Sequence, residues 1–531
     1  MTRIVSILIV FIFISHLLFV NCGKRSFTFP EPSLELNEGA LTIVTEKMIY
    51  ANTEYSVDLG TLTVRENRNG NNSRFIHLPL IRVRTNAEKP LEPVFRLTGG
   101  PGMSNMEHVG MLWYLMPHHD IILLGYRGVD GSSILSCPEL KKAVKGRGDI
   151  FSEKSLRAIS KAWQESAQRL REEGVDIDCY TIIDVIKDLE TARQAFGYEK
   201  INLKSASYGT RVAYLYGLIH PERIHRSAMI SINPPGRFVW ERDVLDEQLR
   251  DYSKLWANDP DASARSNDLY SDMMNVLKRM PDHWLFLPID EGKVRSVAFC
   301  LLFDNAAMPL VFDAFIAARD GDYSGLALMS LAYDFVLPEM FTWGELACKA
   351  VSADYDSIRD YIADMAPTEQ YPMGSPMSQL LWSPMNYGGW PVKSIPKQYR
   401  TLQDSDVETL LLSGSIDVGT PTRYAVQDLL PHLKNGRHFI LAERGHMNIQ
   451  WPNPEACQRL ISSFYETGVA DQSLNKTIPM NFTVAHGFPF MAKLGLGIIA
   501  LIIAIIIGTS YLVIRRVQKK HNTHRHNQIM E

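Results

Sequence analysis

Polar and hydrophobic residues alternate in the first part of the chain, and continuous apolar runs replace this alternation further on. Residues 36–86 hold the alternating segments EYSVDLGTLTV and FIHLPLIRVRT, separated by the turn-rich RENRNGNNS. This pattern predicts an antiparallel pair of strands. Residues 93–100, PVFRLTGG, indicate a further strand, and residues 119–128, HDIILLGYRG, form an apolar run typical of a strand buried on both faces.

Helical spacing and strand patterns then alternate along the chain. Residues 153–197 have the spacing of helices, the strand INLKSASYG and a helix follow, and HRSAMISINPPG predicts the next strand. Strand signals fade over residues 237–402, where helical periodicity dominates, and alternation resumes with VETLLLSGSID, the helix RYAVQDLLPHL and RHFILAERGH. This order predicts an α/β fold with a mostly parallel central sheet flanked by helices. An insertion on the exit side of such a sheet would cover its carboxyl edge as a helical lid.

Both ends of the chain carry apolar runs. The basic start at Arg3 and the apolar stretch up to Val20 predict a secretory signal peptide, with an uncleaved anchor as the alternative. Residues 494–514 contain no charge and are long enough to cross a membrane. Because Arg515 and Arg516 follow them, the C-terminal tail is expected in the cytoplasm. The rest of the protein is then extracellular, periplasmic or lumenal.

The predicted domain organisation follows from these patterns. Lipidation at Cys22 is disfavoured because asparagine precedes it. We expect a signal peptide (1–22), a first core part (35–236), a lid (237–402), a second core part (403–468), a stalk (469–493), a transmembrane helix (494–514) and a cytoplasmic tail (515–531).

Composition narrows the function classes. The chain has 531 residues, 46% of them hydrophobic, and a net charge of -4, so no basic excess points to nucleic acid. The sequence contains no metal-ligand cluster, dinucleotide fingerprint or P-loop, so neither a metal nor a cofactor is expected. Six cysteines in so long a chain do not make a disulfide scaffold. Asn71, Asn475 and Asn481 fit the glycosylation sequon, and the oligomeric state stays open.

Ser207 lies where the strand INLKSASYG turns into a helix. A sharp strand-to-helix turn exposes one side chain at the top of a sheet, which is the physical content of the nucleophile elbow. Small residues are needed two positions before and two after the nucleophile, and here they are Ser205 and Gly209. Taken alone, the pentapeptide fits an ordinary turn equally well.

Asp417 and His446 follow the last two predicted strands. Asp417 ends VETLLLSGSID, and His446 comes directly after Gly445 in RHFILAERGHMN. A serine hydroxyl needs a base to remove its proton, and the base needs a partner that holds its tautomer. The chain order Ser, Asp, His is that of α/β-hydrolases. We therefore predict a triad of Ser207, Asp417 and His446.

An oxyanion hole requires amide donors beside the nucleophile. The N–H of Tyr208, directly after Ser207, is one candidate. The other is the N–H of Gly100 in the glycine-rich segment TGGPG, which follows an earlier strand and whose alternative interpretation is a tight turn.

Five ordered motifs, LTGGPGMSN, GYRGVDGSS, SASYGT, LLLSGSIDVGTP and RGHMN, resemble the α/β-hydrolase family of proline iminopeptidases and tripeptidyl aminopeptidases. The resemblance covers about residues 90–235 and 405–450. It implies an α/β-hydrolase fold with Ser207 as nucleophile, Asp417 as orienting acid and His446 as general base. It also implies removal of residues from peptide N-termini, with the helical insertion restricting access.

The chain departs from this family at two places. Gly125-Tyr126 precede Arg127, where relatives commonly have Asp-Gln or Asp-Asn. The lid cysteine Cys348 is followed by Lys349, where relatives often have an acid suited to a substrate α-ammonium.

Other acids of the lid are therefore candidates for the ammonium site. Glu345 is the nearest to Cys348, and Asp304, Asp313 and Glu339 are alternatives. The resemblance further implies a disulfide between Cys137 and Cys179, and less directly one between Cys300 and Cys348.

The leading hypothesis is a membrane-anchored serine aminopeptidase that acts on peptide substrates through an acyl-enzyme. An ester or lipid hydrolase with the same triad is the main alternative, because fold and triad do not determine the substrate. A non-catalytic surface binding module is the third.

Overall fold

The computed structural model describes residues 27–529, apart from residues 34–36, 71–72, 147 and 450–453. The predicted signal peptide, Cys22 and the sequon at Asn71 lie outside the described residues.

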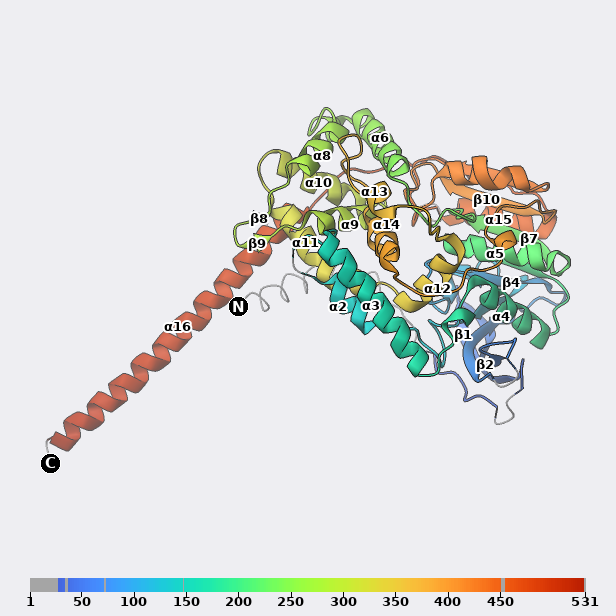
Figure 1. Ribbon diagram of the computed structural model, residues 1–531, viewed down its shortest axis with the longest axis horizontal. Helices are drawn as coiled ribbons and strands as arrows, with labels where there is room; N and C mark the ends of the chain where they lie inside the picture. The colour runs from blue at the N-terminus through green and yellow to red at the C-terminus, as the bar shows by residue number, and fades with distance from the viewer. Residues whose placement is uncertain (1–26, 34–36, 71–72, 147, 450–453, 530–531) are drawn as a thin grey trace.

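A nine-stranded mixed sheet forms the centre of the molecule (Figure 1). Its order is β1-β2-β3-β5-β4-β6-β7-β10-β11. Strands β1, β2, β3 and β5 pair antiparallel, and every pair from β5–β4 to β10–β11 is parallel. The prediction of an antiparallel start and a mostly parallel sheet is thus confirmed. The strands are β1 Leu41–Tyr50, β2 Thr53–Arg65, β3 Phe75–Val83, β4 Leu91–Leu97, β5 His119–Leu124, β6 Ile201–Ala206, β7 Ile224–Ile230, β10 Thr409–Gly414 and β11 Gly436–Leu441.

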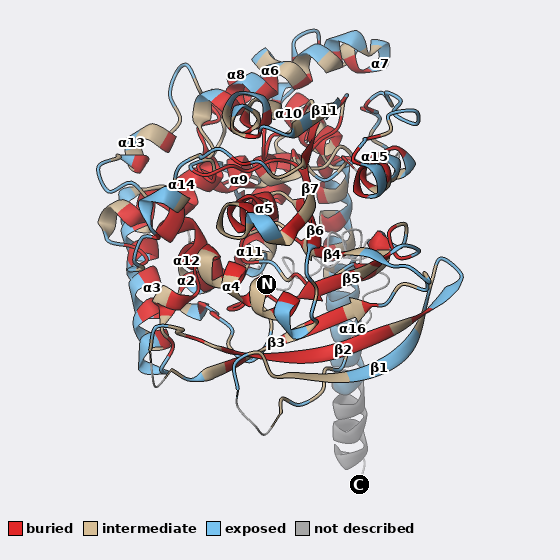
Figure 2. Ribbon diagram, turned by 90° about the vertical axis from the view of Figure 1, so that its right-hand side faces the viewer, coloured by how far each residue is buried: buried red, intermediate tan, exposed pale blue. Residues whose placement is uncertain are grey.

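Helices cover both faces of the sheet, which explains why its central strands are apolar on both sides. Helices α4 (Ile182–Ala195) and α5 (Tyr208–Ile219) contribute to one large apolar cluster. Helix α15 (Pro454–Thr467) buries Leu460, Ile461 and Phe464 in a second cluster on the other face. Figure 2 shows the buried residues concentrated in the strands and on the inward sides of these helices.

The parallel strands β4, β6, β7, β10 and β11 bring their carboxyl ends to one edge of the sheet. The TGGPG segment, Ser207, Asp417 and His446 follow β4, β6, β10 and β11 in turn. Residues far apart in sequence therefore meet at this edge, the usual ligand-binding edge of open α/β sheets.

The insertion over residues 237–402 is mainly helical, as predicted, and lies beside this edge (Figure 1). It also holds one element that the sequence did not indicate, the short hairpin β8 (His283–Trp284) and β9 (Leu287–Pro288). Its helices are α6 Arg242–Asn258, α7 Pro260–Ser263, α8 Leu269–Lys278, α9 Glu291–Leu301, α10 Met308–Arg319, α11 Ser324–Val336, α12 Trp343–Asp354, α13 Tyr361–Met365 and α14 Pro376–Trp382.

Helices α2 (Pro138–Val144) and α3 (Glu153–Glu172) pack with the lid, although the sequence placed them in the first core part. Trp163 of α3 makes edge-to-face contacts with Trp343 and Trp390 of the lid. Helical spacing predicts an apolar face but not the element that covers it.

The segment expected to be a stalk lies against the body instead. Phe482 is buried among aromatic side chains of the lid, Trp256 and Phe312, and the N–H of Met480 donates to Glu443. Helix α16 (Phe488–Ile529) begins directly afterwards. Among the described residues one helix, at Phe488–Val517, is long and apolar enough to cross a membrane.

Candidate active site

Ser207 occupies a strained turn between β6 and α5. Its backbone has φ 54° and ψ -129°, in a region that residues other than glycine rarely adopt. The Ser207 N–H donates to the carbonyl of Ile230 at 2.9 Å, which ties the turn to the neighbouring strand β7. Such an outlier is what a nucleophile elbow requires, because the turn lifts the hydroxyl above the sheet.

The residues flanking Ser207 explain the small-residue pattern of the motif. A Cβ atom at Gly209 would lie 2.4 Å from the carbonyl oxygen of Leu97, so only glycine fits there. Ser205 is buried, and its hydroxyl donates to the carbonyl of Ala228 at 3.3 Å. The serine at the first small position therefore satisfies its own polar group and leaves the turn intact.

The structure brings Ser207, His446 and Asp417 together in one hydrogen-bonded series. His446 Nε2 lies 3.0 Å from Ser207 Oγ, and His446 Nδ1 lies 2.8 and 3.0 Å from the two carboxylate oxygens of Asp417. Asp417 is fully buried and also accepts bonds from the N–H and the hydroxyl of Thr420, each at 2.8 Å. This geometry allows the imidazole to take a proton from the serine while the carboxylate holds its tautomer.

The glycine-rich segment after β4 lies directly beside Ser207. A Cβ atom at Gly99 would come within 2.6 Å of the Ser207 Cβ, and Gly100 has φ 115°, so glycine is needed for close approach and for conformation. Tyr208 is the first residue of α5, so its N–H has no partner within the helix and is free to face an anion. Gly99, next to Gly100, and Tyr208 therefore both adjoin the nucleophile, and the roles of the Gly100 and Tyr208 N–H groups as oxyanion donors stay a prediction.

Side chains of two predicted motifs brace this segment, which we call the oxyanion loop (residues 98–105). Asn105 Oδ1 accepts the N–H of Thr98 at 2.9 Å. The carboxylate of Asp130 accepts the Ser104 hydroxyl at 2.6 Å and the N–H groups of Asn105 and Tyr126 at 3.1 and 2.8 Å. Asp130 of the motif GYRGVDGSS therefore holds the motif LTGGPGMSN in place through hydrogen bonds.

Helix α12 of the lid also holds the oxyanion loop. The N–H of Gly102 donates to Glu345 at 2.6 Å, and the N–H of Thr342 donates to the Gly102 carbonyl at 2.8 Å. Glu345 is fully buried and forms an ion pair with Lys349. Burial raises the pKa of the Glu345 carboxyl, and the Lys349 ammonium opposes this effect. Glu345, the candidate ammonium receptor, is thus already engaged with a cation and with the loop.

Asn305 of the lid forms hydrogen bonds to the loop that carries His446. Its Oδ1 accepts the N–H of Gly445 at 2.8 Å, and its Nδ2 donates to the Glu443 carbonyl at 2.8 Å. The Asn305 N–H donates to Asn448 Oδ1 at 2.7 Å. One lid residue therefore fixes the backbone on both sides of His446, a role that no sequence motif indicated.

An arc of aromatic rings runs through the lid from the nucleophile turn to the histidine. Phe303 packs edge-on against the His446 ring at a centroid distance of 4.8 Å. Successive centroids in the arc are 4.8 to 5.5 Å apart. Its members are Tyr208, Phe238, Trp240, Phe299, Phe303 and His446. The lid thus places aromatic, apolar side chains beside the hydrogen-bonded residues Ser207, His446 and Asp417.

The three alternative lid acids differ in their surroundings. Asp313 pairs with Arg265, and Glu339 is half-exposed and pairs with two lysines, Lys141 and Lys145. Asp304 accepts the side-chain amide of Asn448 and the N–H of Ala306, each at 3.0 Å, and forms no ion pair among the described residues. Asp304 directly follows Phe303, whose ring packs against His446.

The predicted disulfides are wrong, because the five described cysteines are all free thiols. The Cys137 thiol faces the carbonyl of Leu135 and the Cys179 thiol faces Asp176, so the two point to different partners. Cys348 donates to the carbonyl of Ile177 at 3.3 Å and not to Cys300. Burial raises the pKa of the Cys137 thiol to about 12, which suits an inert structural residue.

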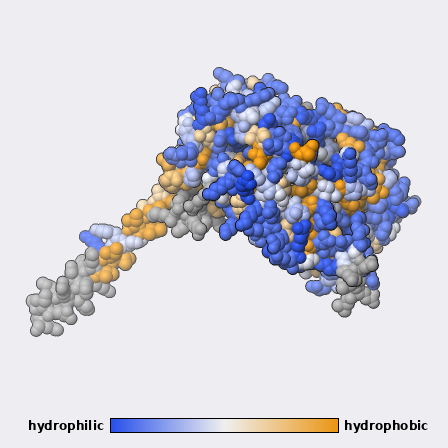
Figure 3. Space-filling model, in the orientation of Figure 1, coloured by the Kyte–Doolittle hydropathy of each residue, from blue (hydrophilic) through white to orange (hydrophobic). Residues whose placement is uncertain are grey.

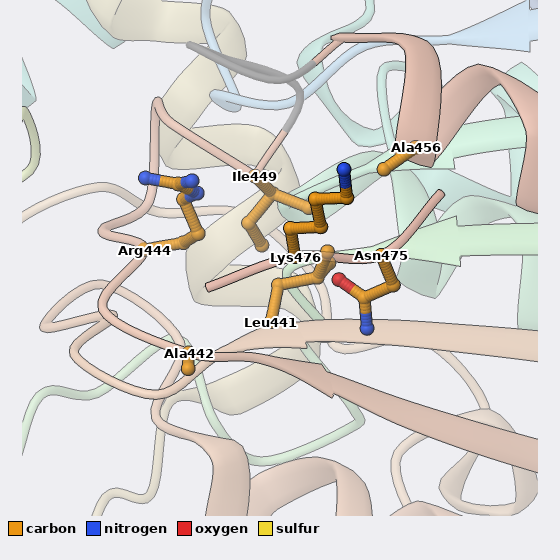
Figure 4. A pocket seen from close by; sticks show the side chains of 7 residues that line it. All are labelled: Leu441, Ala442, Arg444, Ile449, Ala456, Asn475 and Lys476. Atoms are coloured by element: carbon orange, nitrogen blue, oxygen red, sulfur yellow. The ribbon is translucent and has the colours of Figure 1, made fainter. Parts of the chain in front are cut away.

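A small depression is lined in part by Arg444 and Ile449, which lie before and after His446 in the sequence (Figure 4). Its space of about 10 Å³ is that of a single water molecule. Its lining contains no member of the hydrogen-bonded series: Leu441, Ala442, Arg444, Ile449, Ala456, Asn475 and Lys476.

Two family models match the chain. The model described as alpha/beta hydrolase fold matches residues 92–277, and the model described as TAP-like protein matches residues 375–476. The first segment contains Ser207 and the oxyanion loop, and the second contains Asp417 and His446. The two models therefore cover Ser207, Asp417, His446 and the oxyanion loop, whereas Asn305 and Glu345 of the lid lie between the matched segments.

Curated relatives share part of the chain. A tripeptidyl aminopeptidase of Streptomyces lividans is 28% identical over 201 residues, which is 36% of this chain and 37% of the relative. A tripeptidyl aminopeptidase of Streptomyces coelicolor is 29% identical over 174 residues, 32% of either protein. The match thus spans about a third of the length of these relatives.

Solved structures show lower similarity. A proline iminopeptidase of Mycobacterium smegmatis aligns with 13% identity and a TM-score of 0.38, covering 76% of this chain and 97% of that one. A serine hydrolase of Cycloclasticus zankles aligns with 12% identity and a TM-score of 0.36, covering 78% and 100%. On the two family models and the observed sheet topology, this chain has the α/β-hydrolase fold, and about a third of it is similar to the tripeptidyl aminopeptidases.

Proposed function

We propose that this protein is a serine peptidase that releases residues from the N-termini of peptides. The observation that carries the proposal is the series from Ser207 through His446 to the buried Asp417, with contacts of 2.8 to 3.0 Å. The tripeptidyl aminopeptidase relatives support the choice of a peptide bond as the target.

The reaction begins when Ser207 Oγ attacks the carbonyl carbon of the scissile peptide bond. His446 Nε2 takes the hydroxyl proton, and the N–H groups of Tyr208 and Gly100 receive the negative oxygen of the tetrahedral intermediate. His446 then donates that proton to the leaving amine, and the C–N bond breaks to give an acyl-enzyme. A water molecule, deprotonated by His446, attacks the ester and restores Ser207.

Recognition of the substrate's free N-terminus needs an anionic group near the nucleophile. Asp304 is the candidate, since Glu345, Asp313 and Glu339 each already have a cationic partner. In this proposal the α-ammonium of the peptide pairs with Asp304, and the aromatic arc accepts apolar side chains.

An ester hydrolase with the same residues is the second candidate. The aromatic arc beside His446 favours it, because an apolar wall suits an acyl chain as well as a peptide side chain.

Substrate profiling separates the two functions. Turnover of tripeptidyl and aminoacyl arylamides would be compared with that of p-nitrophenyl esters, each with a free or an acetylated amine. The peptidase proposal predicts arylamide cleavage that acetylation abolishes. Ester turnover alone, indifferent to acetylation, would favour the second candidate.

We further propose that α16 anchors the protein in a membrane, with the hydrolase body on the outer side. The apolar, mostly exposed stretch of α16 supports the anchoring (Figure 3), and the basic pair Arg515 and Arg516, which follows residues 494–514 within the same helix, supports the orientation.

A further inference from the structure

The tip of the β8–β9 hairpin exposes two large apolar side chains. Leu285 and Phe286 connect the strands and are 63% and 61% exposed. Leu285 has φ 53°, a left-handed conformation that favours glycine and is unfavourable for leucine. Strain of this kind at an exposed apolar tip is a reason to look for a function.

The hairpin lies beside the point where α16 leaves the body (Figure 1). Helix α11 packs against both the hairpin and α16, so it links the two. At the start of α16, Lys493 pairs with Asp322 at 2.6 Å, and the Ser324 hydroxyl donates to the Pro489 carbonyl at 3.4 Å. The lid and the first turns of α16 are therefore joined by packing and by polar contacts.

The level of the membrane along α16 follows from its basic end. A hydrocarbon core of roughly 30 Å needs about 20 helical residues. Counted back from Arg515, these residues end near Leu496. Ala492 and Ile499 on either side of this level are only 2% and 7% exposed, so α16 is still covered there. The lid edge that packs on α16 consequently reaches the outer surface of the bilayer.

We infer that Leu285 and Phe286 insert into the outer interface of the membrane that α16 crosses, giving the lid a second lipid contact. This inference rests on the proposed anchoring by α16. The half-buried Trp284 precedes the tip, and tryptophan is favoured at the level of lipid headgroups. An aqueous setting would leave both tip side chains without an apolar partner, whereas the bilayer supplies one.

Photo-crosslinking of the full chain in lipid nanodiscs tests the inference. A benzophenone amino acid would replace Phe286, and two further positions serve as references. Ile506, 57% exposed on α16, reports on anchoring. Ile358, an apolar lid residue that is 92% exposed, is the matched control because it lies in the loop before α13, a helix that Figures 1 and 2 show apart from α16.

We expect lipid adducts at position 286 comparable to those at 506 and about tenfold above those at 358. Adducts at 506 with only the control level at 286 would overturn the inference and leave the anchoring in place. No adducts at either position would overturn both. Leu285→Ser with Phe286→Ser should leave soluble-substrate turnover in detergent unchanged, which shows that the variant is folded.

Discussion

At the residue scale, the site depends on side chains that perform no chemistry themselves. Thr420 donates two hydrogen bonds to the Asp417 carboxylate. Asp130 accepts hydrogen bonds from the oxyanion loop, and Asn305 of the lid accepts one from the His446 loop. Each satisfies buried polar groups that would otherwise be left without partners. The distance between Ser207 and His446 therefore depends on the lid as well as on the sheet.

Replacement of Asn305 tests this dependence. Asn305→Ala removes the bonds to Gly445 and Glu443, so His446 should lose its alignment with Ser207. We expect kcat to fall about 10- to 100-fold with KM nearly unchanged. Steady-state kinetics on the best arylamide or ester substrate would measure both.

Asn386→Ala is the matched control. Asn386 is also a lid residue whose amide bonds two backbone groups, those of Arg359 and Tyr361, away from His446. Its loss should cost a similar amount of stability and leave kcat intact. An equal fall of kcat in both variants would mean that Asn305 acts only through general stability.

At the element scale, helix α12 of the lid holds the oxyanion loop through Glu345, which accepts the N–H of Gly102 and forms a buried ion pair with Lys349 of the same helix. Glu345 and Lys349 lie one turn apart and are 0% and 1% exposed. Breaking one partner of such a pair leaves a charge buried without compensation, whereas replacing both is often neutral.

Glu345→Gln should therefore lower the free energy of unfolding by about 3–5 kcal/mol. The double variant Glu345→Gln with Lys349→Met should recover most of this loss. Denaturant unfolding of the two variants and the wild type provides the comparison. Equal losses in the single and double variants would show that the ion pair is not the cause.

The sheet, and the positions of Ser207, Asp417 and His446 directly after its strands, could be predicted from the sequence because the signals for them are local. Apolar runs such as HDIILLGYRG identify strands buried on both faces, and Ser207 lies in a turn whose glycine is required by a 2.4 Å contact. Asn305 carried no such signal, because its partners lie about 140 residues away and are set by tertiary packing. The hairpin at Leu285 was missed because two-residue strands have no period. The cysteine pairs were wrong because they rested on the family resemblance, which does not determine the direction of each thiol in this chain.

At the scale of the whole molecule, the lid joins three partners: the sheet edge, the oxyanion loop and α16. Asp290 caps the N-terminus of helix α9, which leads to Asn305, and its carboxylate accepts the N–H groups of Lys293 and Ile150. Burial raises the pKa of Asp290 from 3.8 to about 6. The folded protein therefore binds this proton more tightly than the unfolded chain does.

Stability should consequently depend on pH through Asp290. The contribution of this group is complete below about pH 4 and is lost as the pH rises through about 6. Asp290→Asn keeps a helix cap without titrating, so its stability relative to the wild type should rise by on the order of 1–3 kcal/mol over this window. Unfolding midpoints of both proteins between pH 4 and 7 measure the difference. A constant difference across the window would contradict the assignment.

The identity of the reacting serine is the central claim, and mapping a fluorophosphonate adduct tests it most directly. The reagent phosphonylates a serine only where a base activates it, and peptide mass spectrometry then locates the modified residue. The wild-type protein should carry the adduct on Ser207, and Ser207→Ala should carry none. An adduct on another residue, or equal labelling of the two proteins, would contradict the account.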